Sequence, residues 1–279
     1  MLKKIIKNGD FLRVVTSLAG LPILWLFLYL GNWPLKAALF ALAATGMYEF
    51  YKALSGKHKT VHFLGYIFAG LHYALLDYQA QNNANVFTII IMSFTLAVCV
   101  AVVIFHSKIN VWDAAVTYFG FCYVAVLLST VYLTNERYGY LLVAVAFISA
   151  WGCDTGAYVV GRTLGRSGKH KLIPSLSPKK TVEGAIGGTV TAGLLTGVLG
   201  LIVSRTNTDG GGILLFVLLG MICAVFAQLG DLFASAVKRH TGIKDFGSIL
   251  PGHGGILDRF DSVFFTAPML YVLALIIIK

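Results

Sequence analysis

Carboxylates, ammonium groups and glycines gather around one polar segment of the sequence, from Ser235 to Asp261. At its start, Asp231, Ser235 and Lys238 are spaced at i, i+4 and i+7. This spacing places an anion, a hydroxyl and a cation on one face of a helix. At its end, Asp258 and Asp261 are three residues apart and share a helix face in the same way. Carboxylates can hold Mg²⁺ and cations can hold phosphates, so the segment is suited to chemistry on phosphate groups.

Two strongly apolar stretches enclose this segment. Residues Ile213–Val237 are largely apolar and are interrupted by Asp231, and the 17 residues Ser262–Ile278 carry no charge. Runs of this length can span a bilayer as helices, so we expect the polar segment to be a loop between two membrane helices. Within the loop, Ser248–Gly255 contains three glycines and one proline, a composition that permits tight turns and close approach of a ligand.

A second polar loop covers residues 161–184. Ser177 is predicted to cap a helix whose first residue is Pro178, so that Lys179 and Lys180 lie in a first turn whose free N–H groups attract anions. From the residues alone, anchoring of these two lysines to anionic lipid headgroups is an equal alternative. The loop has four further cations, which we expect to contact headgroups: Arg162, Arg166, Lys169 and Lys171.

Composition indicates an integral membrane protein. Of the 279 residues, 57% are hydrophobic and 12% are charged, against about 25% charged in an ordinary soluble domain. The four cysteines form no CxxC pair and therefore predict neither a zinc site nor a disulfide framework. The sequence predicts an all-α polytopic fold with about nine membrane helices: Val14–Leu30, Leu35–Leu54, Val61–Leu76, Val86–Phe105, Ala114–Leu133, Tyr138–Val160, Gly184–Val203, Ile213–Val237 and Ser262–Ile278.

Lys and Arg are distributed unevenly between the two ends of these helices. With the N-terminus in the cytoplasm, 18 of the 22 lie on the cytoplasmic side and 4 lie outside. The positive-inside rule then predicts an external C-terminus and places the loops 161–184 and 238–261 in the cytoplasm. It also explains the net charge of +10 better than nucleic-acid binding does, so we expect no nucleic-acid partner.

Two aspartates are predicted to lie within the membrane. Asp154 precedes Arg162 by eight residues and Asp231 precedes Lys238 by seven, so each lies about two helical turns, roughly 11 Å, below the cytoplasmic end of its helix. Because an ionisable group in hydrocarbon is costly, we expect both to face one polar cavity that opens to the cytoplasm. A structural salt bridge to a neighbouring Arg or Lys is the alternative. Glu49, near the end of its helix, is predicted to be an interfacial carboxylate rather than a catalytic one.

Residues 235–261 read S-x-V-K-R-x4-K-D-x-G-x2-L-P-x-H-G-G-I-x-D-R-F-D, which is similar to the signature of the phosphatidate cytidylyltransferases, or CDP-diacylglycerol synthases. The motif spans 27 of the 279 residues, and its length and unusual composition make a chance match improbable. The resemblance extends upstream to D-T-G-A-Y at Asp154, S-P-K-K-T-V-E-G at Ser177 and G-D at Gly230. Residues 1 to about 135 resemble the family mainly in hydropathy.

The resemblance implies transfer of a cytidylyl group from CTP to phosphatidate, which gives CDP-diacylglycerol and pyrophosphate in phospholipid biosynthesis. The implied partners are CTP, phosphatidate and membrane lipids, and a homodimer is compatible with the sequence. We accordingly divide the chain into N-terminal membrane helices, 1–135, and a catalytic membrane region, 136–279. We expect the protein in the cell's inner (plasma) membrane, with the active site facing the cytoplasm.

The resemblance also implies roles for individual residues. Asp231 and Asp258 are implied as metal ligands, with Asp261 and Asp154 as auxiliary ligands, for Mg²⁺ either alone or together with K⁺. The expected catalytic residues are Asp231, Asp258, Lys238 and Arg239. The expected ligands of the phosphates of CTP or lipid are Ser235, Lys179, Lys180, Lys244, His253 and Arg259. For His253, bracing of the loop is the alternative role.

Three other functional classes are compatible with parts of this pattern. A CTP-dependent polyprenol or lipid kinase would use similar groups, but it would transfer the γ-phosphoryl group and release CDP. A transporter would be expected to show paired broken helices in two repeated halves, which the sequence does not show. The CDP-alcohol phosphotransferases are less compatible, because their DGxxAR-type aspartate array is absent.

Overall fold

The computed structural model describes residues 9–56, 59–81, 84–165, 170–206, 212–249 and 254–278. It divides into two compact units, the first formed by residues 1–137 and 241–259 and the second by residues 138–240 and 260–279. The polar segment that opened the sequence analysis is therefore shared: Thr241–Arg259 packs with the N-terminal helices, whereas Asp261 belongs to the C-terminal unit.

Helices make up most of the described chain. Those of the N-terminal part are α2 (Gly9–Leu30), α3 (Asn32–Leu54), α4 (His62–Ala74), α5 (Leu76–Ala80), α6 (Ala84–Ile104), α7 (Val111–Gly120), the π-helical turn η1 (Phe121–Val126) and α8 (Leu127–Tyr138). Those of the C-terminal part are α9 (Tyr140–Thr163), α10 (Val182–Thr206), α11 (Ile213–Thr241), α12 (Leu257–Phe260) and α13 (Val263–Ile277).

Each of the nine predicted spans overlaps a helix of the described residues, and five helical stretches there are long and apolar enough to cross a membrane. These five are Asn85–Ile104, Val111–Tyr138, Tyr140–Thr163, Val182–Arg205 and Ile213–Thr241. With 13 residues, α4 rises only about 20 Å, which is short of a hydrocarbon core of roughly 30 Å. The predicted class, a helical membrane protein, is thus confirmed, while the count of nine spans and the orientation stay predictions.

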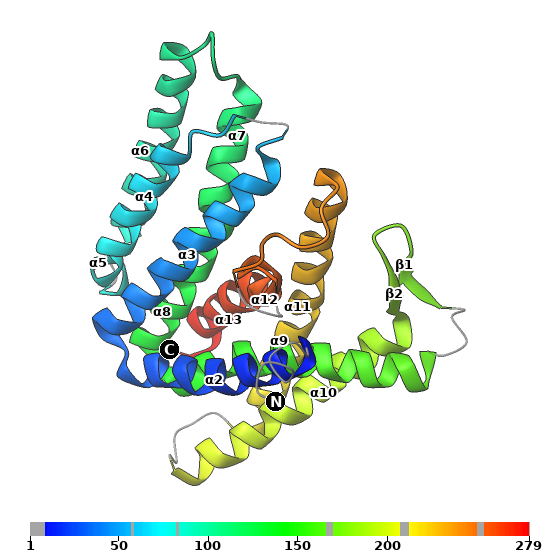
Figure 1. Ribbon diagram of the computed structural model, residues 1–279. Helices are drawn as coiled ribbons and strands as arrows, with labels where there is room; N and C mark the ends of the chain where they lie inside the picture. The colour runs from blue at the N-terminus through cyan, green and yellow to red at the C-terminus, as the bar shows by residue number, and fades with distance from the viewer. Residues whose placement is uncertain are drawn as a thin grey trace, which may run out of the picture. The chain divides into compact units, whose positions relative to one another are not determined.

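The N-terminal unit is built around α3. Its buried residues Leu35, Leu39, Ala43 and Met47 recur every four positions, so one stripe of the helix faces the other helices of the unit. α4 and α7 pack against α3, and Figure 1 shows α3, α4 and α6 side by side. Near the end of α3, burial extends beyond this stripe to Glu49 and Phe50, which are 1% and 2% exposed. A carboxylate is thereby placed in the core of this unit.

In the C-terminal unit α9 and α10 pack closely along their length. A Cβ atom added at Gly188 would lie 2.6 Å from the carbonyl oxygen of Cys153, and one at Gly184 would lie 2.8 Å from that of Ala157. Only glycine permits this approach of one backbone to the other. The close packing fixes the wall that α9 contributes to the site described below.

A β-hairpin precedes α10, which the sequence analysis did not predict. Strand β1 (Lys171–Ile173) pairs antiparallel with β2 (Ser177–Thr181), with Lys171 opposite Thr181 and Ile173 opposite Ser177. Figure 1 shows the hairpin projecting from the start of α10. The predicted helix start at Ser177-Pro178 is therefore wrong, and the hairpin adds a small two-stranded sheet to the predicted helical fold.

The hairpin has a local physical explanation. A residue before proline is biased toward extended backbone, which favours a strand at Ser177. In a two-stranded sheet both strands are edges, where a proline such as Pro178 is tolerated. The helix cap is instead Thr181, whose Oγ1 accepts a hydrogen bond from the N–H of Gly184 at 3.1 Å.

Candidate functional site

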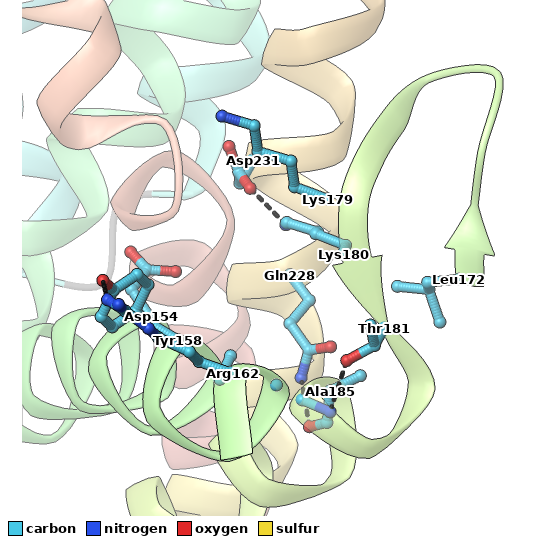
Figure 2. Close-up of a pocket in the computed structure, with 13 residues that line it drawn as sticks. Asp154, Tyr158, Arg162, Leu172, Lys179, Lys180, Thr181, Ala185, Gln228 and Asp231 are labelled. Carbon is cyan, nitrogen blue, oxygen red and sulfur yellow. Dashed lines mark hydrogen bonds and ion pairs between the residues drawn. The ribbon is translucent and has the colours of Figure 1, made fainter. Parts of the chain in front are cut away.

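A cavity of about 530 Å³ lies within the C-terminal unit, among α9, α10, α11 and the hairpin. Figure 2 shows side chains from these elements directed into it. Its polar lining residues are Asp154, Tyr158, Arg162, Lys179, Lys180, Thr181, Gln228 and Asp231. Both intramembrane aspartates predicted from the sequence line this one cavity, which confirms that they share it.

Asp231 and Lys180 form an ion pair across the cavity, from α11 to β2. Their side chains are 28% and 26% exposed, so the pair is shielded from solvent in part. Figure 2 shows Lys179 on the same side of the cavity. The structure thus brings together three of the predicted site residues, and it does so with a strand rather than with the first turn of a helix.

One face of α9 supplies the opposite wall. Asp154, Tyr158 and Arg162 are spaced at four residues and therefore form a stripe along the helix. The Arg162 guanidinium donates a hydrogen bond of 2.7 Å to the Tyr158 hydroxyl, and its Cζ lies 6.0 Å from the ring centroid. The sequence analysis expected Arg162 at lipid headgroups and did not single out Tyr158. In the structure both line the cavity.

Gln228 is a further lining residue that the sequence analysis missed. Its Nε2 lies 3.1 Å from the carbonyl oxygen of Ala185 and 3.0 Å from the hydroxyl of Thr189, which ties α11 to α10. The available signal was a polar amide in an apolar helix, one turn before Asp231. Gln228 holds α11 in the position from which Asp231 reaches Lys180.

Asp261 lies in the turn between α12 and α13 and is 8% exposed. Its Oδ1 accepts a hydrogen bond of 2.7 Å from the N–H of Ser262. Burial raises the pKa of Asp261 to about 7, and the negative charges of Asp231 and Asp154 contribute to the rise. Lys238 acts in the opposite direction. The carboxylates of Asp231 and Asp154 are therefore close enough to Asp261 to act on it electrostatically.

Mg²⁺ prefers hard oxygen anions, and two carboxylates whose negative charge acts on a third are suited to a divalent cation. The donor set thus fits Mg²⁺ in ligand type and in charge. Within the described part of the chain, however, no three His, Cys, Asp or Glu side chains gather at metal-binding distance. Asp231 is neutralised by Lys180 instead.

Asp258, the other predicted principal ligand, belongs to the N-terminal unit. Its Oδ2 accepts hydrogen bonds from the N–H groups of Phe246 at 2.8 Å and Gly255 at 3.1 Å. It therefore holds two points of the polar loop together at the start of α12. Two of the expected phosphate ligands in this loop are exposed: Lys244 and Arg259.

Glu49 contacts the same loop. Its Oε1 accepts from the N–H of Ile256 at 3.1 Å and its Oε2 from that of Leu257 at 2.9 Å. The prediction of an interfacial carboxylate is wrong, because the loop backbone supplies the donors that allow this carboxylate to be buried. Local sequence does not reveal such a contact, since the two donors follow Glu49 by 207 and 208 residues.

The remaining candidates are on α11 or outside the described residues. Ser235 and Lys238 are half-buried and Arg239 is exposed, and none of the three lines the cavity. His253 lies outside the described residues. The assignment of these four residues therefore stays a prediction.

Comparison with known proteins places this geometry in context. The model of the cytidylyltransferase family matches residues 11–277. The chain is 32% identical to a phosphatidate cytidylyltransferase of Bacillus subtilis over 272 residues, which cover 94% of this chain and 96% of the relative. It is 41% identical to a phosphatidate cytidylyltransferase of Staphylococcus haemolyticus over 192 residues, which cover 69% and 70% of the two chains.

Proposed function

The chain belongs to the cytidylyltransferase family, and from this premise we propose that it transfers the cytidylyl group of CTP to phosphatidate, with release of pyrophosphate. The supporting structural observation is the cavity in which Lys179 and Lys180 face Asp231, with Asp154 on the opposite wall. Cations and carboxylates in one partly shielded cavity suit chemistry between two phosphate-bearing substrates.

In this reaction an oxygen of the phosphatidate phosphate attacks the α-phosphorus of CTP. A new phosphorus–oxygen bond forms, the bond to the oxygen that bridges the α- and β-phosphates breaks, and pyrophosphate leaves with that oxygen. The reaction demands in-line positioning and neutralisation of negative charge more than a strong base. Lys179, Lys180 and Arg162 supply positive charge at the cavity wall. We assign these three side chains to the phosphates of the two substrates.

We further propose that Asp231, with Asp154 and Asp261, holds Mg²⁺. This assignment is supported by the effect of the Asp231 and Asp154 charges on the pKa of Asp261, and the family resemblance adds Asp258. A bound Mg²⁺ would neutralise the phosphoryl oxygens of the nucleotide. Because Lys180 already neutralises Asp231, the ammonium and the cation compete for one carboxylate. An accompanying K⁺ remains a prediction from the resemblance.

The apolar helices suit a substrate that resides in a bilayer. We propose that the protein lies in the cell's inner (plasma) membrane with the cavity open to the cytoplasm, where CTP is found. This proposal is supported by the distribution of Lys and Arg between the two sides.

The test uses purified protein in phosphatidate–detergent micelles with CTP and Mg²⁺. We expect pyrophosphate and CDP-diacylglycerol to form in equal amounts. Release of CDP with a newly phosphorylated lipid would instead identify a CTP-dependent lipid kinase. Uptake of phosphatidate or nucleotide into vesicles without covalent change would identify a transporter. Either result would contradict the proposed function.

A further inference from the structure

We propose that Glu49 is a positioning residue for the transfer reaction, because its buried carboxylate fixes the backbone of the polar loop that carries Lys244, Asp258 and Arg259. The inference rests on the proposed function for its catalytic consequence. Its structural part, the ordering of the loop by Glu49, stands on contacts within the N-terminal unit alone.

The first observation is the burial of the carboxylate. Glu49 is 1% exposed, and burial of a charge is costly unless hydrogen bonds compensate it. Compensation comes from the backbone of the loop, since each carboxylate oxygen accepts one N–H, from Ile256 or Leu257. Hydrogen bonds to an ionised acceptor are stronger than those between neutral groups. Both oxygens are thus committed to the loop.

The second observation is how closely the loop surrounds this carboxylate. A Cβ atom at Gly247 would collide with Glu49 Oε1, and one at Gly255 would lie 2.6 Å from Oε2. Carbon and oxygen atoms that are not bonded do not approach this closely, so a side chain at either position would displace the Glu49 carboxylate. Gly247 and Gly255 of the motif therefore leave room for the Glu49 carboxylate of α3. Nothing in the sequence indicates that these residues are in contact.

The third observation is a second carboxylate on the same loop. Asp258 accepts the N–H groups of Phe246 and Gly255, next to those that Glu49 accepts. Two acidic side chains together hold four backbone N–H groups, from both ends of the loop. Glu49 binds the N–H groups of the two residues directly before Asp258, so it fixes the backbone from which this proposed metal ligand extends. With no exposed surface left for substrate, Glu49 acts through the loop.

The experiment compares Glu49→Gln and Glu49→Ala with the wild type. Gln keeps the shape but replaces one acceptor by a donor that faces a backbone N–H. We expect kcat to fall by roughly 10- to 100-fold, the effect typical for groups that orient ligands, with smaller changes in the KM of both substrates. Glu136→Gln, an exposed glutamate of α8, is the matched control and is expected to keep wild-type kinetics.

A second arm tests the contact itself. Gly247→Ala should impair the wild type, because its methyl group meets Glu49, but should cost little further in Glu49→Ala, where space is available. Hydrogen–deuterium exchange in the peptide that covers residues 254–258 should rise in Glu49→Gln. Glu136→Gln should leave that exchange unchanged.

The inference is overturned if folded Glu49→Gln has wild-type kcat and unchanged exchange in residues 254–258. It is also overturned if activity falls only in proportion to the folded fraction, or if the effects of Gly247→Ala and Glu49→Ala simply multiply. An inactive wild type would contradict the proposed function instead. In that case, exchange and melting of the same variants would still decide whether Glu49 orders the loop.

Discussion

At the scale of single residues, the site is defined by which anion meets which cation. Asp231 lies in an apolar helix and is neutralised by Lys180, while the charges of Asp231 and Asp154 both act on Asp261. Asp258, in contrast, accepts hydrogen bonds from two backbone N–H groups with one carboxylate oxygen. The four predicted metal ligands therefore have different surroundings, and substitutions can separate their roles.

The first prediction concerns Asp231 and Asp258. Asn has nearly the same volume but lacks the anionic ligand, so Asp231→Asn and Asp258→Asn should each lower kcat by about 100-fold or more. The double substitution should cost far less than the product, as for residues that act on one ion. The measurement is pyrophosphate release across a Mg²⁺ titration, with a melting curve for each variant.

Retention of near-wild-type turnover at limiting Mg²⁺ by either Asn variant would remove that aspartate from the ligand set. A variant that melts at lower temperature but keeps its Mg²⁺ dependence would point to a structural salt bridge. For Asp231 the partner of such a bridge is Lys180.

The second prediction concerns the two hairpin lysines. Because charged hydrogen bonds contribute about 1.5–3 kcal/mol, Lys179→Gln and Lys180→Gln should each lower kcat/KM by roughly 10- to 100-fold. Lys171→Gln, an exposed lysine of the same hairpin, is the control. Steady-state kinetics with both substrates at low salt make the comparison. Equal, small effects at all three positions would reduce the lysines to headgroup anchors.

The third prediction concerns the pH dependence of stability. Burial raises the pKa of Asp261 from 3.8 to about 7, so the folded state favours the protonated acid. Its contribution to stability is present at pH below 3.8 and is lost as the pH rises through about 7. In the presence of a chelator, the melting temperature of the wild type should fall over this range, and that of Asp261→Asn should fall less. If the melting temperatures of the two proteins changed equally with pH, the raised pKa of Asp261 would be refuted.

At the scale of elements, the hairpin and its junction with α10 decide where the cations lie. Thr181 ends β2 and caps α10, and it packs beside Gly165 and Gly184. Lys180 immediately precedes this junction. The direction in which its side chain extends is therefore coupled to the helix cap.

The fourth prediction follows from this junction. Thr181→Val keeps the shape but removes the acceptor for the N–H of Gly184, which should cost about 0.5–2 kcal/mol of stability. It should also weaken the Lys180–Asp231 contact and raise the KM for CTP. Thr155→Val, an exposed threonine of α9, is the control for the substitution itself. Melting curves and kinetics of the two variants should diverge, and equal behaviour would contradict the capping role.

At the scale of the whole molecule, the chain combines two compact units with apolar helices. Each unit contributes its own acidic groups: Asp154, Asp231 and Asp261 in one, Glu49 and Asp258 in the other. The proposed reaction requires the polar parts of both units to face the compartment that contains CTP.

The fifth prediction concerns this topology. In a cysteine-free background, cysteines at Ser177 and Ile249 should react with a membrane-impermeant thiol reagent only from the cytoplasmic side. A cysteine at Glu136 should react only from outside, because 18 of 22 basic residues are expected inside. Labelling in intact cells and in inverted vesicles distinguishes the two. Reaction of the cysteine at position 249 from outside would contradict the predicted orientation.

The membrane class, the approximate helices and the family could all be predicted from the sequence. Hydrophobic runs are local signals, and so is a 27-residue motif of rare residue types. That Asp154 and Asp231 face one cavity also followed from their matched spacing to nearby cations, and the structure confirmed the shared cavity. The spacing of residues within one helix is sufficient to predict how far a side chain lies from the end of that helix.

Which groups contact one another, in contrast, could not be predicted without the folded structure. The strand at Ser177 forms only by pairing with Lys171–Ile173. The capping preference of a single residue does not predict this pairing. The burial of Glu49 required N–H donors 207 and 208 residues away. The partner of Asp231 depended on how β2 approaches α11. Burial of a charge is favourable only when its compensating groups are in place, and those groups come together only when distant segments pack.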